Sequence, residues 1–140
     1  MLRAVLDANV YVSAAVRPEG PPGRILELFL RRGAFEIVMS QAIADEVLRA
    51  LNYPKGRKYI RAGLDPELWF EDIVVLSHLR AGEYEVQGVS KDPDDDKYIA
   101  AAIEGQAAFV VAGDADLLDV REYEGIRFVN PRAFLTLLGA

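Results

Sequence analysis

The chain of 140 residues contains no cysteine and only one histidine, His78. The absence of cysteine excludes disulfide bonds and thiolate metal sites, and we expect a cytosolic protein. A single histidine cannot form a zinc site without several carboxylates, and in an apolar helical run it is more typical of a structural role. The hydrophobic runs are short, against the roughly 20 residues that a membrane span needs, and the N-terminus lacks a signal-peptide pattern.

Basic residues are fewer than acidic ones, so the net charge is −6. This balance argues against a protein that coats nucleic acid non-specifically. It leaves a nucleic-acid enzyme open, because acids gathered at one metal site lower the pI while a local basic patch can still bind phosphates. With 51% hydrophobic and 27% charged residues, the composition predicts one globular domain over residues 1–140.

Short apolar runs alternate with helical patterns along the chain. The runs that predict buried strands are valine-rich or bounded by Gly, Pro or Asp, and they cover residues 2–7, 35–39, 108–112 and 126–130. The helical patterns cover residues 22–32, 40–51, 66–79, 95–106 and 131–138. This alternation predicts a single-domain three-layer α/β/α fold, with helices on both faces of a central parallel sheet.

The stretch "SKDPDDDKYIAAAIEG", residues 90–105, holds four aspartates within five positions. It could be a calcium loop, a set of helix caps or one wall of an active site. An EF-hand loop needs glycine at its sixth position and glutamate at its twelfth, where this chain has Lys97 and Ile103. The calcium loop is therefore excluded.

Among these aspartates, helical spacing favours Asp96 as the one that points inward. Asp96 precedes Ile99 and Ile103 by three and seven residues, so it lies in line with the apolar face of the predicted helix. Asp95 leans toward the same face. Asp92 and Asp94 are more typical of turn and cap residues in solvent.

Two of the predicted strands lead into an aspartate, Asp7 after the first and Asp114 after the third. Ligands of open parallel sheets bind beyond the carboxyl ends of the strands, where the strand order reverses. If the two strands are neighbours, their carboxylates repel each other unless one is protonated or a cation lies between them. The simpler alternative is that each aspartate only caps the helix that follows.

Glu46 lies on the flank of the apolar stripe of its predicted helix. Taken alone it is more typical of a solvated helix residue. Together, however, Asp7, Glu46, Asp96 and Asp114 can all reach one end of the sheet. Oxygen ligands without histidine or cysteine favour Mg²⁺ or Mn²⁺.

Three motifs in this order, "VLDANVYVSA", "SQAIADEVLRAL" and "DPDDDKYIAAAIEGQAAFVVAGDADLL", resemble the PIN-domain nucleases, in particular the bacterial toxins of toxin–antitoxin pairs. The resemblance implies an acidic pocket that binds Mg²⁺ or Mn²⁺ and cleaves RNA, a small antitoxin partner, and a homodimer or higher homo-oligomer. One departure from the family pattern is Ala112, where Thr or Ser is common.

By position, the catalytic and metal-binding acids of the family fall on Asp7, Glu46, Asp96 and Asp114, with Asp116 as a further metal ligand and Asn9 and Ser40 as polar support. Of the clustered aspartates, Asp96 rather than Asp95 holds the family position before "KYIAAA".

The segment "NYPKGRKYIR" interleaves aromatic and basic residues, which suits a single-stranded RNA backbone with stacked bases. Its candidate RNA-binding residues are Lys55, Arg57, Lys58 and Arg61. A solvated loop explains the same pattern equally well.

Phosphodiester hydrolysis by carboxylate-bound metal needs no Ser–His or Cys nucleophile, and the sequence offers no convincing one. A haloacid-dehalogenase-type phosphatase would need Asp where Asn9 stands, and a receiver domain would need an acidic pair after its first strand. The remaining alternative is a PIN fold that binds RNA or protein without cleaving. Because such a module has no need to keep repelling carboxylates together, the sequence predicts a metal-dependent endoribonuclease.

Overall fold

In the computed structural model, which describes residues 1–140, a six-stranded sheet forms the middle layer. The strand order is β3-β2-β1-β4-β6-β5, and every neighbouring pair is parallel except β5 with β6. The strands are β1 (Arg3–Leu6), β2 (Glu36–Ser40), β3 (His78–Arg80), β4 (Phe109–Val111), β5 (Glu122–Tyr123) and β6 (Ile126–Val129).

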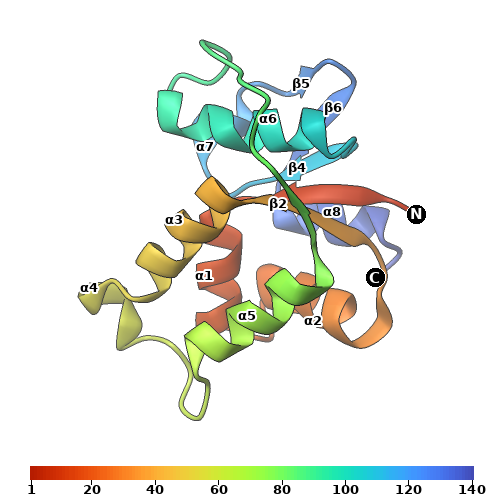
Figure 1. Cartoon of the computed structure of the whole chain (residues 1–140). Coiled ribbons are helices and arrows are strands. Elements are labelled where there is room, and N and C mark those ends of the chain that lie inside the picture. The colour runs from red at the N-terminus through yellow and green to blue at the C-terminus, as the bar shows by residue number, and fades with distance from the viewer.

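Helices cover both faces of the sheet, so the predicted three-layer α/β/α fold is confirmed (Figure 1). On one side lie α1 (Ala8–Val16), α2 (Pro21–Arg32), α3 (Gln41–Leu51) and α5 (Pro66–Leu76), with α8 (Pro131–Leu137) packed against α2. On the other side lie α6 (Asp96–Glu104) and the short α7 (Ala115–Leu118). The remaining elements are α4 (Pro54–Arg57) and a 3-10 turn, η1 (Pro93–Asp95).

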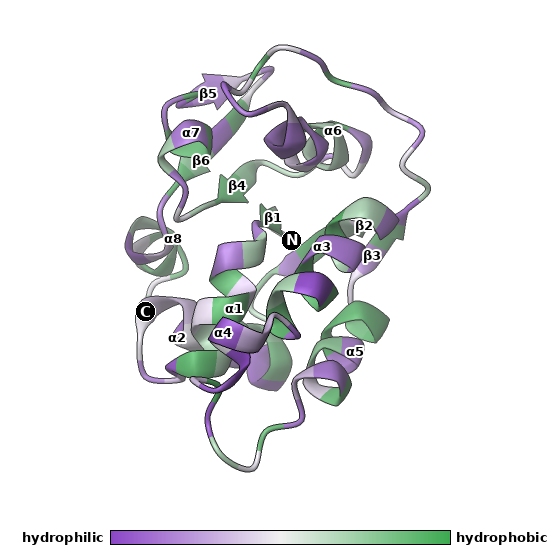
Figure 2. Ribbon diagram, turned by 90° about the vertical axis from the view of Figure 1, so that its left-hand side faces the viewer, coloured by the Kyte–Doolittle hydropathy of each residue, from purple (hydrophilic) through white to green (hydrophobic).

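Apolar side chains fill the space between these layers, and Figure 2 shows the central strands as mainly hydrophobic. Edge-to-face contacts fix the helices on the sheet: the rings of Phe35 and Phe134 lie 5.0 Å apart, and those of Tyr11 and Phe70 lie 5.3 Å apart. Each such pair contributes about 0.5–1.5 kcal/mol beyond the area that it buries. The second pair packs α5 against α1, the helix that begins beside Asp7.

None of the helices has the length and apolar character that a membrane span needs.

The helix α1 is not predicted by the sequence patterns. Its sequence "ANVYVSAAV" is mostly apolar and rich in valine, and only Asn9 and Ser13 mark its exposed face, which is too little polarity to indicate a helix. The helix forms because it is buried between the sheet and its neighbours α2 and α3. Its first turn is fixed by Asp7, whose side chain accepts a hydrogen bond from the backbone N–H of Val10.

The predicted helix over residues 66–79 is wrong at its C-terminal end, because α5 ends at Leu76. The hydroxyl of Ser77 donates to the carbonyl of Ile73 and the backbone of Ser77 leaves the helical region, so the chain turns. The next residues form the edge strand β3 beside β2. His78, at the start of β3, bonds to Glu36 on β2. That contact lowers the pKa of Glu36. His78 therefore has a structural role at the start of the strands, away from Asp7 and Asp114 at their carboxyl ends.

Candidate active site

The site forms where β1 and β4 end side by side. These strands pair in parallel, with Leu6 opposite Val111. Asp7 follows β1 directly, and Asp114 follows β4 after two further residues. The sheet order reverses at β1, which has β2 on one side and β4 on the other. The two strand-end aspartates therefore lie at the crevice that an open parallel sheet offers to ligands.

Asp7 is buried, with only 3% of its surface exposed. Its Oδ1 accepts from the N–H of Val10 at 3.0 Å, and its Oδ2 accepts from the N–H of Gly113 at 3.3 Å. The pKa of Asp7 is raised to about 6: burial and the nearby charge of Asp114 raise it, and the backbone hydrogen bonds lower it in part. Asp7 thus caps a helix and also shares a charged site, which combines the two alternatives considered from the sequence.

Asp96 is also buried, but its carboxylate binds backbone N–H groups of the preceding loop. Its Oδ1 accepts from the N–H of Ser90 at 2.8 Å, and its Oδ2 accepts from the N–H of Gly88 at 3.0 Å. Both oxygens therefore hold the loop that precedes η1. The structure does not direct this carboxylate toward Asp7 and Asp114.

Asp95, rather than Asp96, faces Asp114. It is 9% exposed, and its Oδ2 is buried with no hydrogen-bond partner. Burial, followed by the carboxylates of Asp114, Asp92 and Glu46, raises the pKa of Asp95 to about 8. Asp95 ends the 3-10 turn rather than belonging to α6, so the spacing of the α-helix does not set its direction.

Ligand atoms of Asp92, Asp95 and Asp116 all lie within 4.8 Å of one another, a group that could hold a metal ion. Asp116 is joined to the strand-end aspartate, since its N–H donates to Asp114 Oδ1 at 3.1 Å. We call the five residues linked by these contacts the acidic cluster: Asp7, Asp92, Asp95, Asp114 and Asp116.

Glu46 on α3 borders the acidic cluster, and both of its oxygens are engaged. One accepts from the hydroxyl of Tyr98, and the other forms an ion pair with Lys97. The Tyr98 hydroxyl also accepts from the N–H of Ala8 at 3.1 Å. Burial and the bond to Glu46 raise the pKa of Tyr98, so it stays a donor. Neither Lys97 nor Tyr98 is among the sequence candidates, although both stand in the "DKYIAAA" motif.

Three further polar side chains surround the site. The hydroxyl of Ser40, at the end of β2, accepts from the N–H of Ile43 and so caps α3. Asn9 is exposed on α1. The buried hydroxyl of Tyr11 has no partner, and burial followed by the charge of Asp7 raises its pKa.

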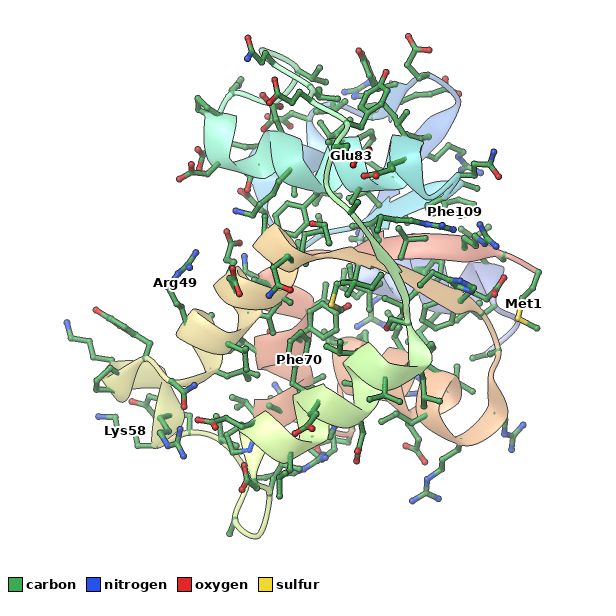
Figure 3. The ribbon with its side chains drawn as sticks, viewed as in Figure 1. Met1, Arg49, Lys58, Phe70, Glu83 and Phe109 are labelled. Carbon is green, nitrogen blue, oxygen red and sulfur yellow. The ribbon has the colours of Figure 1, made fainter.

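An open groove of about 410 Å³ leads from Asn9 and Glu46 along α3 to Arg49, Tyr53 and Gly56. Figure 3 shows Arg49 projecting outward from α3, on the same side of the molecule as Lys58. Arg49 was not expected from the sequence, because one cation on a helix is ordinarily solvated.

The basic segment that was predicted to bind RNA divides in the structure. Lys55, Arg57 and Lys58 are exposed on and beside α4, and the Lys58 ammonium lies 5.2 Å from the centre of the exposed Tyr59 ring. Arg61 instead lines a separate cavity of about 390 Å³ next to Trp69 and α2. Arg61 is therefore not brought to the groove.

Comparison with known proteins agrees with this arrangement. The profile of the PIN-domain family matches residues 3–116. The uncharacterized protein MJ1680 of Methanocaldococcus jannaschii is 29% identical over 126 residues, which cover 86% of this chain and 76% of the relative.

Two solved structures share the fold. VapBC2 from Rickettsia felis, bound to a DNA fragment from the promoter, matches with a TM-score of 0.59 and 12% identity, over 92% of this chain and 98% of the matched chain. PAE2754 from Pyrobaculum aerophilum matches with a TM-score of 0.54 and 14% identity, over 99% of this chain and 90% of that one.

Proposed function

Because the chain belongs to the PIN-domain family, we propose that it is a nuclease that uses Mg²⁺ or Mn²⁺ to hydrolyse RNA phosphodiester bonds. The family is generally one of nucleases, which agrees with the acidic crevice at the carboxyl end of the sheet.

The observation that carries the proposal is the unpartnered Oδ2 of Asp95. Buried polar atoms in folded proteins nearly always have a partner, and an exception calls for an explanation such as a bound ion. Here burial, followed by the neighbouring carboxylates, raises the pKa of the group that carries this oxygen to about 8. A divalent cation would supply the missing partner and offset the repulsion.

The donor set fits a hard cation, because every donor in the acidic cluster is a carboxylate oxygen. We assign the ion to the acidic cluster: Asp92, Asp95 and Asp116 have ligand atoms within 4.8 Å of one another, and Asp7 and Asp114 complete the set. This assignment replaces Asp96 by Asp95, because Asp96 faces the backbone of Gly88 and Ser90 whereas Asp95 faces Asp114.

A divalent ion at such a site supplies an acidified water and neutralises charge on the phosphoryl oxygens. The residues of the chain provide the geometry. Tyr98 joins three elements, since it lies on α6, accepts from Ala8 on α1 and donates to Glu46 on α3. This bridge holds Glu46 in place near Asp95, and in-line attack on phosphorus depends on such fixed positions.

The groove beside Glu46 suits a single-stranded substrate. Arg49 offers a cation for a phosphate, and the exposed ring of Tyr53 offers a surface for base stacking. Bases in a single strand can be splayed onto such rings, whereas a duplex hides them. Lys55, Arg57 and Lys58 continue the positive charge past the end of the groove.

We extend the proposal to a toxin with a small antitoxin partner, because the Rickettsia felis neighbour is a VapBC2 complex with promoter DNA. The exposed apolar side chains on α5 and β3 support a contact surface for such a partner: Leu68, Val75, Leu76 and Leu79. Self-association of the chain remains a prediction, and light scattering measures it.

The direct test is incubation of single-stranded RNA with the protein in Mn²⁺ and in EDTA. Cleavage in Mn²⁺ that stops in EDTA supports the nuclease. RNA binding in both solutions without cleavage in either would favour the non-cleaving binding module instead.

A further inference from the structure

The ion pair between Lys97 and Glu46 is the only salt bridge of the structure that involves a residue of the site, since the others join different side chains. The Lys97 side chain is 22% exposed and that of Glu46 is 29% exposed. The pair is therefore half-buried and borders the groove that contains Glu46.

Consecutive residues at the start of α6 turn to three different partners. Asp95 faces Asp114, Asp96 holds the preceding loop, and Lys97 pairs with Glu46. The ammonium of Lys97 is thereby fixed next to the acidic cluster by the same short segment that supplies Asp95. The ring of Tyr98, 5.3 Å from the ammonium, adds a cation–π contact on another side.

Both oxygens of Glu46 are engaged by side chains, and one of these partners is a cation, which disfavours a metal ion on the same carboxylate. One oxygen accepts from Tyr98 and the other from Lys97. Many nucleases place two divalent ions about 3.5–4 Å apart, and a second ion needs a carboxylate of its own at the edge of the first site. In this chain Lys97 is paired with Glu46, the carboxylate that borders the acidic cluster.

Resting on the proposed function, we propose that Lys97 is a built-in cation that takes the place of a second metal ion, so that the site binds a single Mg²⁺ or Mn²⁺. The acidic cluster binds the one ion, and Glu46 stays in its ion pair with Lys97. A simple surface ion pair would also join these two residues, but it would leave the number of bound metals unaffected by its removal.

The test counts Mn²⁺ ions bound to the full chain, by electron paramagnetic resonance of free Mn²⁺ and by calorimetry. The wild type should bind one ion. Lys97→Met frees Glu46, so the number should rise to two, and Lys97→Met combined with Glu46→Gln should return it to one. Lys91→Met is the matched control, because Lys91 is exposed and pairs with Asp119 outside the cluster.

A second variant keeps the test decisive if Lys97→Met does not fold. Glu46→Gln preserves the shape of the side chain and should leave the single ion bound, because Glu46 is not one of its ligands. Loss of Mn²⁺ binding in Glu46→Gln, two ions in the wild type, or one ion in a folded Lys97→Met would each overturn the inference. If the wild type binds no Mn²⁺ at all, the proposed function itself fails, which is a distinct outcome.

Discussion

The carboxyl group of Asp95 faces that of Asp114, the aspartate that follows β4. Burial and this contact together raise the pKa of Asp95 to about 8. Two acids so placed repel each other when both are ionised, unless a cation lies between them. The relationship therefore links proton binding, metal binding and stability in one pair of residues.

Affinity for Mn²⁺ should increase with pH. The ion binds the ionised carboxylates, so it must displace protons from Asp95, with a pKa of about 8, and from Asp7, with a pKa of about 6. Titration calorimetry between pH 5.5 and 8.5, in buffers with different ionisation enthalpies, measures both the affinity and the protons released. A constant affinity without proton release would show that these groups do not bind the ion.

The metal-free protein should lose stability as the pH rises from about 4 to about 8. Asp95 has an ordinary value of 3.8 in the unfolded chain and about 8 in the folded one, so over this range the folded state keeps a proton that the unfolded state has lost. Urea unfolding in EDTA at pH 5 and pH 8 measures the difference. Asp95→Asn should weaken this dependence and be more stable than the wild type at pH 8, while equal slopes in the two proteins would refute the explanation.

Asp96→Asn should act on stability rather than on the metal. The amide nitrogen of asparagine cannot accept a hydrogen bond, so the N–H of Gly88 or Ser90 loses its partner, at a cost of about 1–3 kcal/mol. Asp94 is exposed and its Asn variant should stay within about 0.5 kcal/mol of the wild type. If Asp96→Asn instead has the same free energy of unfolding as the wild type and loses Mn²⁺ binding, Asp96 is the ligand, as the sequence pattern suggested.

These aspartates show how far the sequence leads. The strand-end acids Asp7 and Asp114 are predictable, because parallel strands end at one edge of a sheet whatever the details of packing. The choice between Asp95 and Asp96 is not, because it depends on a 3-10 turn whose rotation per residue differs from that of the helix after it. The pairing of Lys97 with Glu46 joins residues 51 positions apart and has no periodic signal.

The helices and strands likewise divide into those that the sequence predicts and those that it does not. Strands with valine-rich runs and helices with an apolar stripe are found where the pattern places them. The helix α1 and the strand β3 are not, because burial and edge pairing decide their conformation rather than local propensity.

RNA affinity should depend on the groove. Arg49→Gln should weaken binding and lower the salt dependence by about 0.7 in the logarithmic slope, since one counterion contact is lost. Tyr53→Ala should cost about 1–3 kcal/mol if a base stacks on the ring. Arg61→Gln is the control, because Arg61 lines the cavity beside Trp69. Filter binding at several salt concentrations measures all three, and an effect at Arg61 equal to that at Arg49 would place the RNA elsewhere.

The central claim is that a metal ion held by Asp95 and its neighbours cleaves RNA. The most direct measurement is single-turnover cleavage of one single-stranded RNA at fixed Mn²⁺ by the wild type, Asp95→Asn and Asp94→Asn. The account predicts a loss of orders of magnitude for Asp95→Asn in a folded protein, because electrostatic stabilisation is usually the largest catalytic contribution, and a rate near that of the wild type for Asp94→Asn. Equal rates for all three proteins, or cleavage by the wild type that persists in EDTA, would contradict it.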